Sequence, residues 1–324
     1  MHVVLTGATG FLGNNVLRLL LQLNHRVTCL VRQSQVPESL VGLSAELLRC
    51  DLASPQLDEL LPGDFDALIH CAAQIQIGRT KLVESRQSNV VTTANLAAIC
   101  RSRGRRMLNV STVDTLAYSS NGLPCTESDR EPGKPPSTYV VTKKEAEQVF
   151  YRELHQGLDG VILQPGFMLG RYDWKPSSAE MMLAVARFKP PFAPAGGASV
   201  TDVRDVAQGI VSAITQARTG ENYILGGHNV SYLELWQRMA TTIGCRTPRF
   251  ALPNWMARVG GWAGDLKAMV SRNETNLNSM AAAMGQLQHY YSSAKAIEEL
   301  DYTLRPLDEA IEQCWEWIKE RGWV

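Results

Sequence analysis

The sequence predicts an α/β fold with a doubly wound parallel sheet, and two observations carry this prediction. Short apolar strands alternate with segments of helical period through the first half of the chain. Parallel strands need crossover helices, and these helices then cover both faces of the sheet. A glycine-rich turn also joins the first strand to the first helix. The 324 residues, 45% hydrophobic and 20% charged, are enough to bury a full core.

The first predicted domain covers residues 1–165. Its strands are expected at His2 to Thr6, Arg26 to Val31, Glu46 to Leu48, Ala67 to His70, Met107 to Ser111 and Val161 to Gln164. Its helices are expected at Phe11 to Leu23, Gln56 to Leu60, Leu82 to Ser102 and Thr138 to His155. This order of elements is what a series of strand, crossover helix and next parallel strand requires.

The second predicted domain, residues 166–324, is a smaller and mainly helical region packed on the sheet. The regular alternation loosens after Pro165, where Pro- and Gly-rich loops mix with helical segments. We expect segments near 199–226 to return to the large sheet. The expected elements are helices at Val203 to Thr215, Tyr232 to Ile243, Trp255 to Val270 and Leu307 to Lys319, and a strand at Asn222 to Leu225.

Charge and cysteine usage exclude several function classes. Lys and Arg together number 32, as do Asp and Glu, and this balance argues against nucleic acid or an anionic membrane surface as a partner. No apolar run approaches the ~18 residues of a membrane span, and we expect no signal peptide. The seven cysteines are dispersed without a CxxC pair, which favours reduced thiols in a cytoplasmic protein and no metal site.

Three glycines, Gly7, Gly10 and Gly13, lie at the turn between the first strand and the first helix. Gly7 suits a tight turn, Gly10 lets the backbone approach a pyrophosphate, and Gly13 permits close packing of helix on strand. The helix N-terminus offers free N–H groups and a positive dipole end to phosphates. An ordinary turn is the alternative, but the strand–turn–helix context favours a dinucleotide site. The other loop residues expected in this site are Thr9, Phe11 and Leu12.

The end of the second strand indicates which dinucleotide binds. A carboxylate at this position would accept the ribose 2′-OH of NAD, but the segment after Val31 carries Arg32 and no acid. A guanidinium suits phosphate oxygens or stacking on adenine. The sequence therefore predicts NADP(H) over NAD(H), with a solvated arginine as the alternative.

Two later strand ends fit the same cofactor. Asp51 follows the third strand, where its carboxylate could accept from the adenine amino group while Leu52 packs on the ring. The fourth strand ends in Cys71, Ala72 and Ala73, whose small side chains leave room for the cofactor. Either segment alone would be an ordinary loop.

Tyr139 and Lys143 open a predicted helix after a Pro-rich loop. Their i, i+4 spacing places the phenol and the ammonium on one face of that helix. A neighbouring cation would lower the tyrosine pKa from ~10, so that its proton could reach a carbonyl oxygen near neutral pH. Thr112, at the end of the fifth strand, is the expected second donor to this oxygen, with Ser111 as the alternative.

With these features the chain resembles an extended short-chain dehydrogenase/reductase of the epimerase/dehydratase superfamily, whose fold is of Rossmann type. The resemblance implies that Tyr139 is the acid/base, that Lys143 binds the nicotinamide ribose, and that Thr112 positions the reacting oxygen. It further implies that Asn89 orders the site, that residues 166–324 bind the substrate, and that the protein is a homodimer built on the helices at 82–102 and 138–155. The remaining cofactor contacts implied are Pro165 and Gly166.

The sixth strand departs from the pattern of nucleotide-sugar enzymes in this family. Phe167 and Met168 stand where those enzymes usually carry an Asn. The chain is more similar to the dihydroflavonol-4-reductase branch, which implies hydride transfer between NADPH and the carbonyl or alcohol of a small, fairly apolar substrate. Two alternatives remain: a nucleotide-sugar epimerase or dehydratase, and a non-catalytic protein on the same fold.

Overall fold

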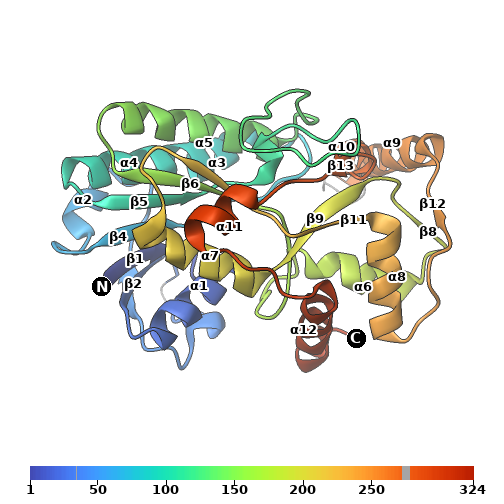
Figure 1. The fold of residues 1–324 in the computed structure, drawn as a ribbon, viewed down its shortest axis with the longest axis horizontal. Coiled ribbons are helices and arrows are strands. Elements are labelled where there is room, and N and C mark those ends of the chain that lie inside the picture. Colours follow the sequence, from blue (N-terminus) through green and yellow to red (C-terminus); the bar gives the residue numbers. More distant parts are fainter. Residues whose placement is uncertain (34, 272–277) are drawn as a thin grey trace.

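The computed structural model describes residues 1–33, 35–271 and 278–324 (Figure 1). A seven-stranded sheet with the strand order β10-β6-β5-β4-β1-β2-β3 forms its centre, and every neighbouring pair is parallel. The strands are β1 (His2–Thr6), β2 (Arg26–Val31), β3 (Glu46–Arg49), β4 (Ala67–His70), β5 (Arg106–Val110), β6 (Gly160–Pro165) and β10 (Asn222–Leu225). The predicted doubly wound parallel sheet is confirmed.

Helices cover both faces of this sheet, as Figure 1 shows. One face carries α1 (Phe11–Gln22), α7 (Val203–Gln216) and α11 (Ala294–Leu300), while α4 (Thr92–Ser102) and α5 (Thr138–His155) cover the other. Alternate residues of each strand point to opposite faces, so both helix layers meet an apolar surface.

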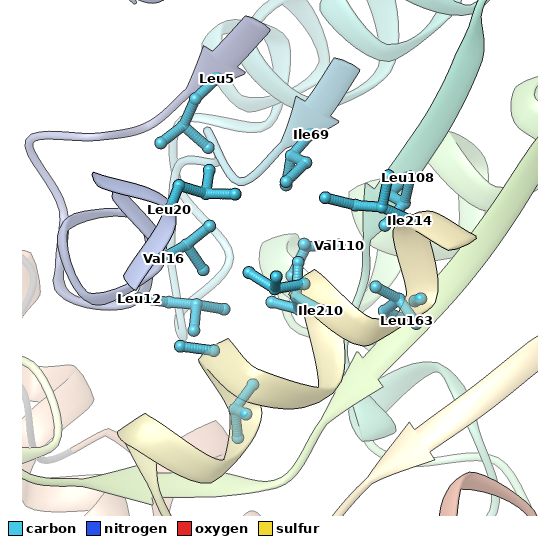
Figure 2. Close-up of a cluster of buried hydrophobic side chains, with 14 of the residues drawn as sticks. Leu5, Leu12, Val16, Leu20, Ile69, Leu108, Val110, Leu163, Ile210 and Ile214 are labelled. Atoms are coloured by element: carbon cyan, nitrogen blue, oxygen red, sulfur yellow. The ribbon is translucent and has the colours of Figure 1, made fainter. Parts of the chain in front are cut away.

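The core between the sheet and the helix pair α1 and α7 consists of fully buried aliphatic side chains. Each such side chain contributes about 1.5–3 kcal/mol when removed from water. Figure 2 shows the helix and strand side chains converging at Val16, Leu20, Ile210, Ile214, Leu108 and Leu163. This layer holds α1 rigidly behind the glycine turn.

One predicted helix is interrupted. The segment 82–102 consists of α3 (Leu82–Arg86), a π-helical turn (Gln87–Val91) and α4 rather than a single α-helix. π-helical turns often occur at functional sites. Here the turn contains Asn89, whose side chain is buried.

The C-terminal region is mainly helical but also contains a four-stranded sheet that the sequence did not predict. In that sheet β9 (Gly197–Asp202) pairs with β7 (Phe167–Leu169), β11 (His228–Ser231) and β13 (Gln288–His289). Of the segments expected to return to the large sheet, β10 joins it as a strand, α7 packs on its face, and β9 instead belongs to the second sheet.

Further helices and short strands complete the C-terminal region. The helices are α6 (Ala179–Phe188), α8 (Tyr232–Ile243), α9 (Asn254–Ser271), α10 (Ser279–Met284) and α12 (Leu307–Glu320), and β8 (Phe192–Ala193) pairs with β12 (Phe250–Ala251). The remaining short elements of the first half are the helix α2 (Leu57–Leu60) and 3₁₀ turns at Glu38–Leu40 and Val113–Thr115. Among the described residues, no helix is both long and apolar enough to cross a membrane.

Candidate active site

The glycine turn after β1 has the backbone geometry that its sequence requires. Gly7 has a φ of +74°, and a Cβ there would lie 2.7 Å from the backbone nitrogen of Ala72. A Cβ on Gly13 would lie 2.2 Å from the carbonyl oxygen of Gly7. A side chain at position 7 would push the loop away from the segment that follows β4, and one at position 13 would push α1 away from the loop. Both glycines are therefore needed for the loop to lie close to these two elements.

The N-terminus of α1 is suited to bind phosphate. Gly10 is its N-cap residue, no side chain caps the helix, and its first turn carries no acidic residue. The first N–H groups of a helix lack intrahelical partners, and here they lie at the positive end of the helix dipole. This turn therefore fits the pyrophosphate of a dinucleotide. Of the other loop residues, Thr9 and Phe11 are partly exposed, whereas Leu12 packs in the core and has only its backbone to offer a ligand.

Arg32 lies at the carboxyl end of β2 and is exposed. It forms no ion pair with any residue in the described part of the chain. Its neighbour across the sheet edge is a second exposed arginine, because Val31 of β2 stands opposite Arg49 of β3. Two arginines thus lie at this edge, although the sequence pattern singled out only the first.

Asp51 and Leu52, which follow β3, lie in different environments. Asp51 is exposed, and its Oδ1 accepts a hydrogen bond of 3.0 Å from the backbone N–H of Ala53. Leu52 is buried in the core layer beneath α4. Its carbonyl oxygen accepts a 3.1 Å hydrogen bond from Asn95.

A buried hydroxyl fixes the segment Cys71, Ala72 and Ala73 after β4. Thr6 Oγ1 accepts from the backbone N–H of Ala72 at 3.1 Å and lies 2.8 Å from His70 Nδ1. Burial and the charge of Lys143 lower the pKa of His70 to about 3, so its ring is neutral. Burial also raises the pKa of the Cys71 thiol to about 12, which leaves it unreactive.

Tyr139 lies in the first turn of α5, next to Thr112 at the end of β5. Its backbone N–H donates to the carbonyl oxygen of Gln76 at 2.9 Å. Burial and the negative charge of Asp114 raise the pKa of Tyr139, with the nearby Thr112 hydroxyl acting in the opposite direction. The expected lowering of this pKa is therefore wrong for the structure as it stands, because burial outweighs any stabilisation of the phenolate.

Lys143 lies one helical turn after Tyr139 and is buried. Its Nζ donates to the carbonyl oxygen of Val110 at 2.8 Å. Burial lowers the pKa of Lys143 to about 8, while the nearby carboxylate of Glu147 partly opposes this shift. The ammonium thus loses its proton unusually close to neutral pH.

Glu147 continues the i, i+4 series of Tyr139 and Lys143, and the sequence reasoning missed it. Its carboxylate is buried and accepts from Ser111 at 2.6 Å, from Thr115 at 2.8 Å and from Gln164 at 3.0 Å. Ser111 is therefore occupied in this network, which favours Thr112 as the hydroxyl beside Tyr139. The helical spacing was the signal that could have identified Glu147.

Asn89, in the π-helical turn, connects the loop after β4 to α5. Its Oδ1 accepts from the backbone N–H of Gln74 at 2.7 Å, and its Nδ2 donates to the carbonyl oxygen of Gln74 and to Thr142, each at 3.0 Å. Because Tyr139 bonds the same loop at Gln76, Asn89 helps to hold the N-terminus of α5.

The junction after β6 brings the two sheets together. Gly166 donates its backbone N–H to the carbonyl oxygen of Leu225 at 3.0 Å. A Cβ on Gly166 would lie 2.6 Å from the carbonyl oxygen of Ser199, so this position admits only glycine without a shift of the backbone. Pro165 ends β6 and is buried. Among the described residues, no group of three or more His, Cys, Asp and Glu side chains could hold a metal ion.

A glycine turn between a strand and a helix of a doubly wound parallel sheet is typical of dinucleotide-binding proteins. The model of the NAD dependent epimerase/dehydratase family matches residues 3–226. The chain belongs to this family.

Three known proteins are similar over nearly the whole chain. The putative dihydroflavonol 4-reductase of Synechocystis sp. is 29% identical, covering 98% of this chain and 95% of that protein. The crystal structure of gox2253 has a TM-score of 0.84 at 29% identity, covering 99% and 98%. PA4631, a nucleoside-diphosphate-sugar epimerase from Pseudomonas aeruginosa, has a TM-score of 0.80 at 25% identity, covering 100% and 99%. The resemblance to the dihydroflavonol-4-reductase-like branch is confirmed.

Proposed function

We propose that the protein is an NADP(H)-dependent oxidoreductase that transfers a hydride between NADPH and the carbonyl or alcohol group of a small, fairly apolar substrate. The observation that carries this proposal is the buried Lys143, whose Nζ is held by the carbonyl oxygen of Val110 at 2.8 Å one helical turn after Tyr139 on the same face of α5. The similarity to a putative dihydroflavonol 4-reductase over 98% of the chain supports a reductase.

The chain's own residues supply the proton and the orientation. The nicotinamide cofactor supplies the hydride when it is bound. Tyr139 gives its proton to the carbonyl oxygen. Burial raises the pKa of this phenol and so weakens it as an acid, which is why the transfer needs the Lys143 ammonium beside the phenolate that forms. Thr112 holds the same oxygen through its hydroxyl. The Lys143 ammonium binds the nicotinamide ribose and stabilises the phenolate that remains, while Asn89 positions α5.

The preference for NADP(H) rests on Arg32. It is an exposed cation without a carboxylate partner in the described part of the chain, at the strand end where the adenosine ribose binds in this fold. The N-terminus of α1, with the loop 7–13, binds the pyrophosphate. Asp51, Leu52, the segment 71–73 and the junction Pro165–Gly166 border the rest of the cofactor.

The test of this function is consumption of NADPH with a panel of ketones and aldehydes. Tyr139→Phe is expected to remove most of the turnover, because it deletes only the proton donor, and to leave NADPH binding nearly intact. Tyr172→Phe is the matched control, since the Tyr172 ring packs between Arg18 and Trp317 through its faces and edges. Undiminished turnover in Tyr139→Phe would falsify the assignment.

A nucleotide-sugar epimerase or dehydratase is the second candidate, favoured by the 25% identity to a nucleoside-diphosphate-sugar epimerase over the whole chain. The same residues would then oxidise and re-reduce the substrate without net use of cofactor. Cofactor that stays bound through purification, binding of UDP-sugars and no net NADPH consumption would select this candidate.

The proposed location rests on the dispersed free cysteines, and the proposed assembly on the resemblance to extended short-chain dehydrogenase/reductases. We propose a cytoplasmic homodimer built on the helices around 82–102 and 138–155, in which residues 1–165 bind the dinucleotide and residues 166–324 bind the substrate.

A further inference from the structure

A surface cavity of about 730 Å³ lies between α1 and α7, and it shares no residue with the glycine turn or with Tyr139 and Lys143. The helices α1 and α7 cover one face of the large sheet, whereas α4 and α5, on which the proposed dimer is built, cover the other. The cavity therefore stays open in that dimer. Its volume is in the range of sites that hold small molecules.

The wall of this cavity is rich in arginine. Among the described residues that line it there is no aspartate or glutamate, although the chain as a whole has balanced charge. The four arginines of the wall are Arg18, Arg171, Arg204 and Arg305. A wall of this kind favours a ligand that carries negatively charged oxygens.

Carboxylates outside the cavity hold three of these arginines in place. The pairs are Arg171 with Glu316 and Glu320, Arg204 with Asp202 and Glu309, and Arg305 with Asp205. Such pairs fix the plane of a guanidinium but use only some of its five N–H donors. Within the described chain, Arg204 Nη1 and Arg305 Nη2 donate to no other group. These arginines thus add oriented donors to the wall rather than net charge.

Arg18 supplies the net positive charge, because it forms no ion pair with any described residue. Its Nε donates to Asn14 Oδ1 at 2.9 Å, and its guanidinium carbon lies 3.8 Å from the centroid of the Tyr172 ring. Both contacts restrain the side chain and leave its two Nη groups without a partner in the described part of the chain. Arg18 therefore presents a preoriented pair of donors to the cavity.

The backbone of Tyr172 is held in an uncommon conformation beside Arg18. Its φ is +71°, a region that costs a non-glycine residue about 1–2 kcal/mol. The Tyr172 ring packs edge-on against Trp317, with 5.2 Å between the ring centroids, and stacks on Arg18. Residues in such conformations persist where the surroundings hold them, and they often lie at ligand sites.

We propose that this cavity binds a phosphorylated polyol, and that Arg18, Arg204 and Arg305 donate to its phosphate. A phosphate monoester has three terminal oxygens and a charge of about −1.5 to −2 near pH 7, so it can accept from several guanidiniums at once. A carboxylate has only two oxygens and one charge. Gln22 and Gln208 line the same cavity, and their amides can both donate to and accept from the hydroxyl groups of a polyol.

The experiment measures binding to the full chain by isothermal titration calorimetry at low ionic strength. The protein is first saturated with NADPH, so that the dinucleotide site does not compete for phosphate. The probes are glucose 6-phosphate, inorganic phosphate and glucose. The variants are Arg18→Met and Arg18→Lys. Arg238→Met is the matched control, because Arg238 also lines a surface cavity, between α8 and α12, and pairs with carboxylates there.

The wild type is expected to bind glucose 6-phosphate more tightly than inorganic phosphate, and glucose least of the three. Arg18→Met is expected to weaken the binding of glucose 6-phosphate by roughly 10- to 100-fold, the range of a hydrogen bond to a charged group. Arg238→Met is expected to keep the wild-type Kd. If Arg18→Met fails to fold, as judged by its thermal transition, Arg18→Lys provides the comparison, with a loss of roughly 10-fold because it keeps the charge without the paired donors.

The outcomes test the phosphate and the polyol separately. A wild type that does not bind glucose 6-phosphate, or an equal Kd in the wild type and the folded Arg18 variants, overturns the site. Inorganic phosphate that binds as tightly as glucose 6-phosphate overturns the polyol part of the proposal. None of these readouts depends on turnover, so the proposed oxidoreductase function stands or falls independently.

Discussion

At the scale of single residues, the proposed function makes proton donation by Tyr139 depend on the charge of Lys143. The Lys143 ammonium lies in a buried position between the Val110 carbonyl and the Glu147 network. Because burial disfavours the charged form, its pKa falls to about 8. Above this pH the lysine is neutral and no longer stabilises a phenolate or binds ribose hydroxyls with a full charge.

The kcat/KM for carbonyl reduction is therefore expected to fall as the pH rises through about 8. Lys143→Arg keeps its charge at every accessible pH, so its lower activity should show no decline in this range. A pH–rate profile from pH 6 to 10 measures both. A wild-type profile that stays flat to pH 10 would contradict the assignment of this group.

The proposed preference for NADP(H) depends on Arg32. Arg32→Asp is expected to reverse the preference for NADPH over NADH, because a carboxylate repels the 2′-phosphate and accepts the 2′-hydroxyl. Arg26→Asp is the matched control, since Arg26 lies at the opposite end of the same strand and pairs with Glu46. The measurement is the ratio of kcat/KM with NADPH to kcat/KM with NADH. An unchanged ratio in Arg32→Asp would contradict the proposed role of Arg32 in cofactor selection.

At the scale of elements, the contact between the glycine turn and α1 shapes the phosphate site. Gly13→Ala places a Cβ 2.2 Å from the Gly7 carbonyl oxygen, where only a backbone shift can relieve the clash. The cost of such overpacking is about 1–3 kcal/mol. We expect a lower Tm and weaker NADPH binding, measured by thermal shift and fluorescence titration.

Gly260→Ala is the control for this substitution. Gly260 lies in α9, where nothing stands within 4 Å of the new Cβ, and Ala favours a helix over Gly by about 1 kcal/mol. Its Tm should stay equal or rise. A Gly13→Ala protein with unchanged Tm and NADPH affinity would show that the close approach is not required.

The sequence predicts those elements whose pattern is local. The strands at 26–31, 67–70 and 222–225 have the predicted bounds, because each is an apolar run between turn residues. The π-helical turn at 87–91 escaped prediction because it keeps the apolar spacing of a helix. The second sheet escaped because two-residue strands such as β13 form only through pairing with distant segments.

The candidate site was also predictable only in part, because only some of its features depend on residues close together in the sequence. Glycine spacing and the i, i+4 pair of Tyr139 and Lys143 are visible in the sequence. The contact of Thr6 with His70, and that of Asp114 with His289, joins segments far apart along the chain. No local sequence pattern predicts such pairs, so they can be identified only from the three-dimensional structure.

At the scale of the whole molecule, two sheets meet at one edge. The chain passes directly from β6 of the large sheet into β7 of the small one, through the close approach of Gly166 to Ser199. This junction brings His289 of the small sheet next to the catalytic end of the large one. In the proposed function, the cofactor side and the substrate side of the reaction thus belong to different sheets.

The fate of the hydride tests the central claim most directly. NADPH with deuterium at both hydrogen positions of nicotinamide C4 is incubated with the protein and each ketone of the panel, and the products are analysed by mass spectrometry. The account predicts an alcohol that carries one deuterium at the former carbonyl carbon, formed in equal amount to the NADP⁺. Products without deuterium, or cofactor that is not consumed while a nucleotide sugar is isomerised, would contradict it.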